Sequence, residues 1–146
     1  MSHGILVMQV SIMAQNEQQT RLLRLSNIDL TVADPAEDVR GRKVVDKDGA
    51  RIGAVSDLIV DDREQRVRFL EVVAGDLFGL GRQKALIPVE AITRIGHDTV
   101  YVNQTQHDIS QAPPYDPELI DEEVGDGSYY GHLYRYDGYP PYWGTA

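Results

Sequence analysis

Two neighbouring segments of alternating polarity constrain the fold of this chain more than any other feature. Arg51 to Val60 (RIGAVSDLIV) and Val67 to Ala74 (VRFLEVVA) alternate apolar and polar side chains over much of their length. A period of two is typical of half-buried strands. The connector from Asp61 to Arg66 is polar, and five of its six residues are charged. The pattern therefore predicts a β-hairpin.

Both faces of this hairpin carry apolar side chains. In the first strand, Ile52 and Val55 fall on opposite faces. In the second strand, the face of Leu70 and Val72 is favoured as the core face over the face of Phe69. Apolar weight on both faces suits a strongly curved sheet that is covered on two sides for part of its length.

A second hairpin precedes the first one. Residues 38–45 have extended character, and Asp46-Lys47-Asp48-Gly49 supplies a turn with glycine where positive φ is needed. Upstream, residues 21–28 begin the sheet, with Leu23 and Leu25 expected on one face.

Strand and turn signals continue at a spacing of about ten residues. Residues 84–89 read as a strand with proline near its end, and 93–102 as strand, turn and strand. Residues 90–92 make one helical turn or stay extended. No helix of useful length is predicted, which favours an all-β fold, a small antiparallel β-barrel with extended N- and C-terminal segments. Its predicted buried residues are Val44, Ile52, Leu58, Leu70, Val72, Ile87 and Val100.

A chain of 146 residues suits one domain with a modest core. We expect a flexible segment at 1–20, the barrel at 21–112 and a tail at 113–146. Within the first segment, Ile5 to Met8 is apolar enough to add a strand to a sheet edge, as the alternative to disorder. Met13 begins an equally good native N-terminus, so residues 1–12 are either native or an extension.

The tail differs in composition from the rest of the chain. It contains seven acidic residues and one basic residue, and its prolines and glycines predict little regular structure. Disordered segments are poor in aromatic residues, whereas tyrosine and tryptophan are enriched in interfaces. We therefore predict that its aromatic residues bind either the barrel or a second protein; they are Tyr129, Tyr130, Tyr134, Tyr136, Tyr139, Tyr142 and Trp143.

Composition excludes several classes of function. The net charge of -9 argues against a nucleic-acid-binding surface, which needs basic residues to displace counterions. Without cysteine there is no disulfide and no thiolate site, which fits a cytoplasmic protein. No apolar run approaches the roughly 18 residues that span a bilayer, and Gly4 to Met8 lacks the flanks of a signal peptide.

A series of short motifs resembles the PRC-barrel family. Residues 39–46 (VRGRKVVD) are followed by Asp48-Gly49 and then by Ile52-Gly53-Ala54-Val55 with Asp57-Leu58. Gly79, Gly81 and Leu86-Ile87-Pro88-Val89 fit the same pattern, as does Ala112-Pro113-Pro114-Tyr115-Asp116. The resemblance covers residues 39–116.

This resemblance implies a small barrel like those of the photosynthetic reaction centre H subunit and the C-terminal domain of the ribosome maturation factor RimM. Both of those are interaction or assembly modules and not catalysts. The membrane helix of the first and the N-terminal domain of the second have no counterpart in this sequence. Neither specific role is therefore carried over.

Two loops deserve comparison with ligand-binding motifs. Asp46 to Gly49 begins like a calcium loop, but such a loop has glycine at its sixth position and glutamate at its twelfth. Arg51 and Asp57 stand there, so a plain turn is preferred. Gly79-Leu80-Gly81-Arg82 resembles part of a phosphate loop, yet no helix follows it. The apolar residues of this glycine-rich loop are expected to cap the barrel or to form a contact patch; they are Leu77, Phe78 and Leu80.

The remaining polar candidates favour ordinary surface roles. Asp61, Asp62 and Glu64 are interpreted as a solvated turn, with a weak divalent-ion site as the alternative. His97, His107 and His132 are isolated from a serine with an acid partner, so nothing indicates a hydrolase triad.

We therefore predict no catalytic residue, cofactor or metal. The expected function is a non-catalytic protein-interaction or assembly module that binds a partner or itself. A small-molecule or metal-binding barrel that uses the glycine-rich loop and the acidic turns is the alternative.

Overall fold

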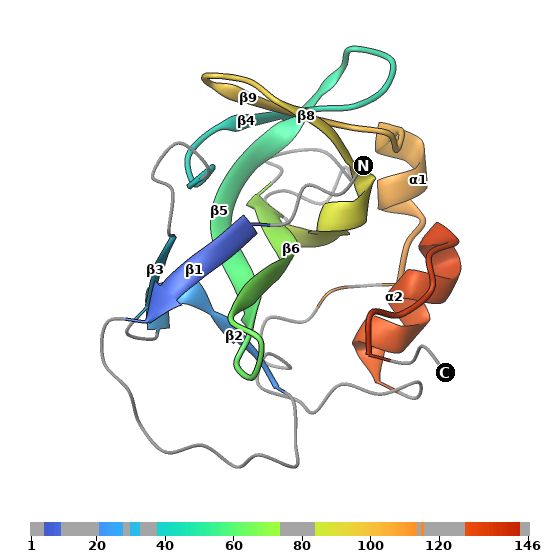
Figure 1. Cartoon of the computed structure of the whole chain (residues 1–146). Helices are drawn as coiled ribbons and strands as arrows, with labels where there is room; N and C mark the ends of the chain where they lie inside the picture. The colour runs from blue at the N-terminus through green and yellow to red at the C-terminus, as the bar shows by residue number, and fades with distance from the viewer. Residues whose placement is uncertain are drawn as a thin grey trace.

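The fold is that of a computed structural model, in which strands dominate and two short helices follow them (Figure 1). The structure describes residues 5–9, 21–27, 30–32, 38–73, 84–113, 115 and 128–143, the strands at 5–9 and 30–32 by their backbone alone.

The central hairpin is confirmed. Strand β5 (Arg51–Asp61) pairs antiparallel with β6 (Arg66–Val73). Its turn is closed by Asp61, whose Oδ1 accepts hydrogen bonds from the backbone N–H groups of Arg63 at 2.7 Å and Glu64 at 2.9 Å. The pairing shifts at two irregularities, one at Ser56 of β5 and the other at Arg68 of β6, and bulges of this kind bend a strand. Figure 1 shows β5 as one long curved strand.

The second hairpin is confirmed as well. Strand β4 (Lys43–Val45) pairs antiparallel with β5, and Gly49 in their turn has φ +87°. The carboxylate of Asp46 accepts from the backbone N–H groups of Asp48 at 2.9 Å and Ala50 at 2.8 Å. These bonds are those of a plain turn, as the sequence indicated.

One parallel pair corrects the expectation of a wholly antiparallel barrel. The other strands of the sheet are β1 (Ile5–Gln9), β2 (Leu22–Arg24), β3 (Leu30–Val32), β7 (Lys84–Pro88), β8 (Ile92–Ile95) and β9 (Thr99–Val102). The sheet runs in the order β3-β1-β6-β5-β4-β9-β8, with β2 added on β5 and β7 on β6. Every described pair is antiparallel except that of β4 with β9. Two parallel neighbouring strands must be joined by a long crossover connection. Here strands β5 to β8 lie between β4 and β9 along the sequence. A local sequence pattern cannot reveal such a pairing.

The strands that follow the central hairpin agree with the sequence. Strand β7 (Lys84–Pro88) pairs with β6 and leads into the single 3-10 turn η3 (Val89–Ala91). Strand β8 (Ile92–Ile95) then pairs with β9 through a tight turn. Of the two possibilities at residues 90–92, the helical turn is adopted at Glu90 and Ala91, whereas Ile92 is extended.

The N-terminal segment adopts the alternative that the sequence left open. Residues Ile5–Gln9 form β1, which pairs with β3 (Leu30–Val32) and with β6. Strand β7 covers β6 only from Phe69 onward, which leaves Arg66 and Val67 to pair with β1. The start of β6 is therefore a sheet edge to which an extended segment can add.

The expected face of residues 21–28 is partly wrong. Strand β2 (Leu22–Arg24) pairs with β5 and passes at once into the 3-10 turn η1 (Leu25–Asn27). The turn breaks the alternation, so Leu22 is buried and Leu23 is only half-buried. Leu25, which was expected on the same face as Leu23, is buried.

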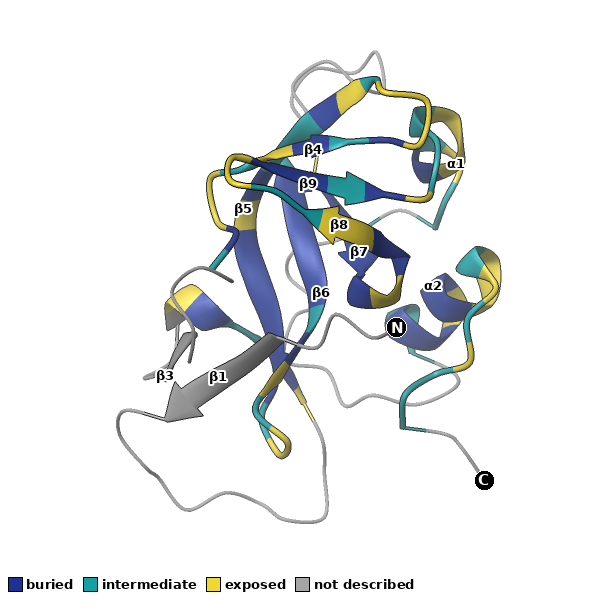
Figure 2. Cartoon of the chain, turned by 45° about the horizontal axis from the view of Figure 1, so that its top comes forward, coloured by how far each residue is buried: buried dark blue, intermediate teal, exposed yellow. Residues whose placement is uncertain are grey.

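Two hydrophobic clusters lie on the two sides of the sheet. The barrel core contains all seven of the residues predicted to be buried, none of them more than 4 % exposed. The outer cluster lies under the second helix and consists of Leu22, Ile59, Phe69, Leu86, Tyr130, Leu133 and Tyr134. Figure 2 shows the resulting burial along both β5 and β6.

Two helices correct two expectations: α2 (Tyr129–Asp137) lies in the tail, where little regular structure was predicted, and α1 (Gln106–Ser110) lies in the range predicted as barrel, where no helix was predicted. Helix α1 begins with a capping box between Thr105 and Asp108. Helix α2 begins at Ser128, whose hydroxyl accepts from the Gly131 N–H at 3.2 Å, and ends at Gly138, with φ +83°. Serine before a helix and glycine after it are strong local signals, and they outweigh the prolines on either side. In the part of the chain that the structure describes, neither helix has the length and apolarity of a membrane span.

Candidate interaction surface

Helix α2 lies beside the barrel (Figures 1 and 2). One row of its side chains packs against the outside of the sheet. Tyr130, Leu133 and Tyr134 follow the i, i+3, i+4 spacing of a helix face and are each at most 1 % exposed. They join Phe69 and the other sheet residues of the outer cluster. This row anchors the tail to the barrel.

The anchor is largely aromatic. The Phe69 ring centroid lies 5.5 Å from that of Tyr130 and 5.2 Å from that of Tyr134. After Gly138 the chain turns back, so that the Trp143 ring lies 5.5 Å from Tyr134 and 5.2 Å from Tyr142. Tilted and edge-to-face pairs at these separations add stabilisation beyond that of buried area.

Arg68 on β6 completes this contact with the end of the tail. Its guanidinium lies 3.9 Å from the centroid of the Tyr142 ring, a cation–π geometry. Burial, together with the neighbouring Asp61 carboxylate, raises the pKa of Tyr142. The last residues of the tail are therefore held by polar as well as apolar groups.

Four buried polar atoms at this contact have no hydrogen-bond partner among the described residues. They are Asp61 Oδ2, Arg68 Nε and the hydroxyls of Tyr134 and Tyr142. A buried polar group that stays unsatisfied costs about 1–3 kcal/mol.

A second attachment is made by Glu71, a buried acid on β6 whose role the sequence did not reveal. Its side chain is 1 % exposed and accepts from the Tyr115 hydroxyl at 2.6 Å and from the Ser56 hydroxyl at 2.8 Å. Arg24 forms an ion pair with it at 2.8 Å. Burial, and the hydrogen bond to this carboxylate, raise the pKa of Tyr115. Glu71 thus fixes the start of the tail to the sheet.

The other buried acids also hold structure in place. Asp57 accepts from the Ser26 hydroxyl at 2.5 Å and from the Leu58 N–H at 2.8 Å, which secures η1. Asp46 Oδ2 accepts from the Gln106 N–H at 2.9 Å, which ties α1 to the β4–β5 turn. These carboxylates are occupied by neighbouring donors, so they are poor candidates for acid–base chemistry.

The predicted tail residues separate into two groups. Tyr130 and Tyr134 are buried against the barrel of their own chain, whereas Tyr136 is 42 % exposed. The remaining four are half-buried. We call the residues that keep part of their surface exposed the aromatic surface; they are Tyr129, Tyr136, Tyr139, Tyr142 and Trp143.

The other candidates are either outside the described residues or ordinary. Leu77, Phe78 and Leu80 lie outside them, as does the glycine-rich loop, so their contact role stays a prediction. His97, His107 and His132 are exposed in a turn and in the two helices.

In the acidic turn between β5 and β6, the three acidic side chains make three different contacts. Asp61 caps the turn, Asp62 accepts from the Arg21 N–H at 3.0 Å, and Glu64 forms an ion pair with Arg68. Across the described ranges, no three His, Asp or Glu side chains are grouped as metal ligands.

The fold and these contacts define a small curved barrel that carries a docked C-terminal helix. The family model of the PRC-barrel domain matches residues 33–109, more than half of the chain. The chain therefore belongs to the PRC-barrel family, as its motifs indicated. Tyr115 and α2 follow the matched region. A search among curated proteins found no similar protein.

Proposed function

We propose that this chain is a non-catalytic protein-interaction module, in which the barrel presents the aromatic tail to a protein partner, a second copy of the chain included. The observation that carries the proposal is the two-sided arrangement of the tail. One aromatic row anchors α2 to the sheet, and the aromatic surface remains partly accessible.

Such an arrangement suits recognition for a physical reason. Tyrosine and tryptophan offer large contact areas with few rotatable bonds, and they dominate binding hot spots. A segment already held in place loses less conformational entropy on binding than a free one. The docked tail thus satisfies both requirements for a binding surface.

The proposal is tested with one tail variant and one control. Tyr136→Ala combined with Trp143→Ala removes two rings of the aromatic surface. Tyr130, Leu133 and Tyr134 are unchanged, but the contact of Trp143 with Tyr134 is lost as well. His97→Ala changes an exposed side chain in the β8–β9 turn. Each protein is used to capture partners from a lysate of the source organism, and its mass is measured by size-exclusion light scattering against the monomer mass of 16.3 kDa.

We expect the wild-type protein and the control to retain the same partner, or the same mass above that of the monomer, and the tail variant to lose it. A tail variant that captures the same proteins and keeps the same mass as the wild-type protein would overturn the proposal. Dispersed NMR spectra of all three proteins would establish that folding is not the cause.

A further inference from the structure

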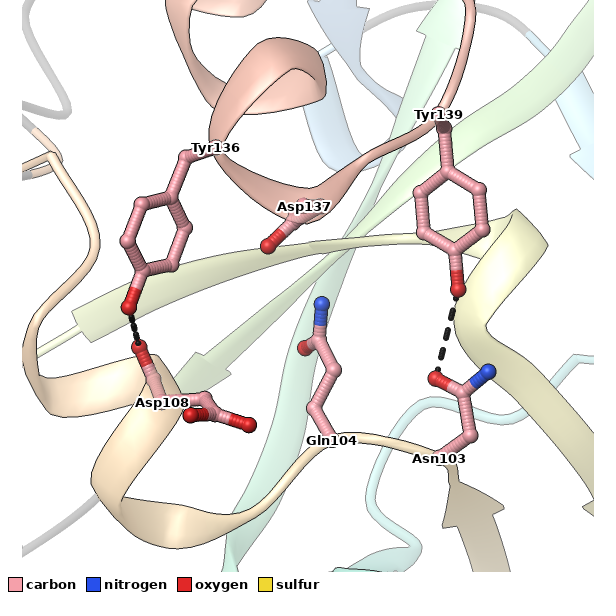
Figure 3. A pocket seen from close by; sticks show the side chains of 6 residues that line it. All are labelled: Asn103, Gln104, Asp108, Tyr136, Asp137 and Tyr139. Carbon is pink, nitrogen blue, oxygen red and sulfur yellow. Dashed lines mark hydrogen bonds between the residues drawn. The ribbon is translucent and has the colours of Figure 1, made fainter.

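A polar pocket lies where the end of α2 meets α1 and the residues after β9 (Figure 3). Its volume is about 410 Å³, within the range of small-ligand sites. Its lining residues come from three parts of the chain and are Asn103, Gln104, Asp108, Tyr136, Asp137 and Tyr139.

The walls of the pocket are tied together by hydrogen bonds. The Tyr136 hydroxyl donates to the Asp108 carbonyl at 2.8 Å, and the Tyr139 hydroxyl donates to Asn103 Oδ1 at 3.2 Å. The Gln104 carbonyl accepts from the Lys47 N–H at 3.1 Å, which fixes this wall to the barrel. The pocket is therefore formed before any ligand arrives.

The charge inside the pocket is negative. Two carboxylates, those of Asp108 and Asp137, line it, and no Lys, Arg or His is among its lining residues. Burial raises the pKa of Asp137 to about 6. The hydrogen bond with the Gln104 side chain acts against this rise, and the charges of Asp108 and Glu90 add to it. Asp137 also lies in the last turn of α2, where the helix dipole disfavours an anion. At neutral pH a carboxylate thus stands in the pocket at an energetic cost that a cation would relieve.

We propose that this pocket receives the cationic side chain, lysine or arginine, of a protein partner. The proposal rests on the interaction function proposed above and names the chemistry of the partner at one point of contact. In Figure 3 the Asp137 carboxylate and the Gln104 amide point toward each other, with the rings of Tyr136 and Tyr139 on either side. Carboxylate and amide oxygens accept hydrogen bonds from an ammonium or guanidinium group, and tyrosine rings attract it through their faces.

The form of the pocket favours a side chain over a bare metal ion. A calcium site requires six to eight oxygen ligands close around one point. The pocket offers two carboxylates in a space of about 410 Å³, which suits a long and flexible cation better. The net charge of -9 would also attract a basic partner.

The test uses the full-length protein labelled with ¹⁵N. The probes are the N-acetyl, methylamide derivatives of lysine and arginine, with the norleucine derivative as the uncharged control and MgCl₂ as the metal control, all at constant ionic strength. We expect saturable shifts of the Asn103 and Gln104 side-chain amide signals with the two cationic probes only.

Asp137→Asn should weaken binding of the lysine probe about tenfold or more, because it removes one charged partner without changing side-chain size. Asp98→Asn makes the same change in the exposed β8–β9 turn and should leave the affinity unaltered. The proposal is overturned if the shifts do not saturate, if norleucine binds equally well, if Mg²⁺ binds more tightly, or if Asp137→Asn binds as the wild-type protein does.

The two proposals fail in different ways. If partner capture depends on Tyr136 and Trp143 and not on Asp137, the module function stands and the pocket proposal is wrong. Suppose instead that the lysine probe binds at Asp137 while the tail variant changes neither capture nor mass. The module function is then wrong, and the pocket binds a cationic group that does not belong to a protein partner of the tail.

Discussion

Leu133→Ala is the most direct test of whether the tail is docked in solution. The Leu133 side chain is 1 % exposed and lies in the outer cluster, between α2 and the sheet. Truncating a buried leucine to alanine costs about 2–5 kcal/mol. Alanine is at least as good a helix former as leucine, so a loss of stability would report lost packing and not a weakened helix.

The size of the loss also has an upper bound set by the structure. A chain whose tail has undocked no longer depends on Leu133, so the measured loss cannot exceed the free energy of docking. The expected loss is therefore about 2–5 kcal/mol, or the free energy of docking where that is smaller.

The assay exploits the position of the single tryptophan. Trp143 is the only tryptophan of the chain and lies in the tail, so its fluorescence reports docking, whereas far-ultraviolet circular dichroism reports mainly the sheet. Urea unfolding of the wild-type protein should give coincident curves from the two probes. In Leu133→Ala the fluorescence curve should move to lower urea and precede the dichroism curve.

A matched control lies one residue away on the same helix. His132 is exposed, and His132→Ala should change the stability by less than about 0.5 kcal/mol. If Leu133→Ala behaves like His132→Ala with both probes, and Trp143 emits as a fully hydrated indole, the tail is not docked and the reasoning fails.

Three further predictions concern individual residues. Leu70→Ala should cost about 2–5 kcal/mol in urea unfolding, since Leu70 is fully buried in the barrel core, and a much smaller loss would contradict that placement. Gly49→Val should lower the melting temperature, because φ +87° costs a β-branched residue about 1–3 kcal/mol of backbone strain while a Cβ meets no atom within 4 Å; an unchanged melting temperature would refute the strain argument. The pKa of Asp137 is raised from an ordinary 3.8 to about 6, so the folded state binds a proton more readily than the unfolded chain does. The contribution of this group to the free energy of unfolding therefore falls as the pH rises from one of these values to the other. Asp137→Asn should therefore gain stability relative to the wild-type protein between about pH 4 and about pH 7, and a gain independent of pH would count against it.

Local features of the barrel could be predicted from the sequence. The alternation in β5 and β6 and the glycine at position 49 are signals between near neighbours, and the structure confirms both hairpins. The parallel pairing of β4 with β9 could not be predicted, because it depends on how distant segments cross. The burial of Phe69 and Glu71 likewise depends on the tail that covers them.

The tail was harder to predict because two kinds of signal conflict there. Prolines and glycines are dense, yet the stretch from Ser128 to Gly138 contains no proline and begins and ends with good capping residues. The prediction that the tail aromatics bind the barrel or a second protein left both alternatives open, and Tyr130 and Tyr134 pack against the barrel. The pocket could not be predicted, since residues 103–108 and 136–139 meet only after α2 has docked.

The positions of the buried acids explain why the barrel and the tail act as one unit. Asp46 joins the β4–β5 turn to α1, and Glu71 joins the sheet to Tyr115. Removing one partner of such a buried contact costs more than the contact contributes, because the other partner is left uncompensated. Each link is therefore costly to break while the barrel is folded. It follows that the aromatic surface and the pocket around Asp137 exist only when the barrel positions both helices, and that a ligand held between α1 and α2 would stabilise the docked tail in turn.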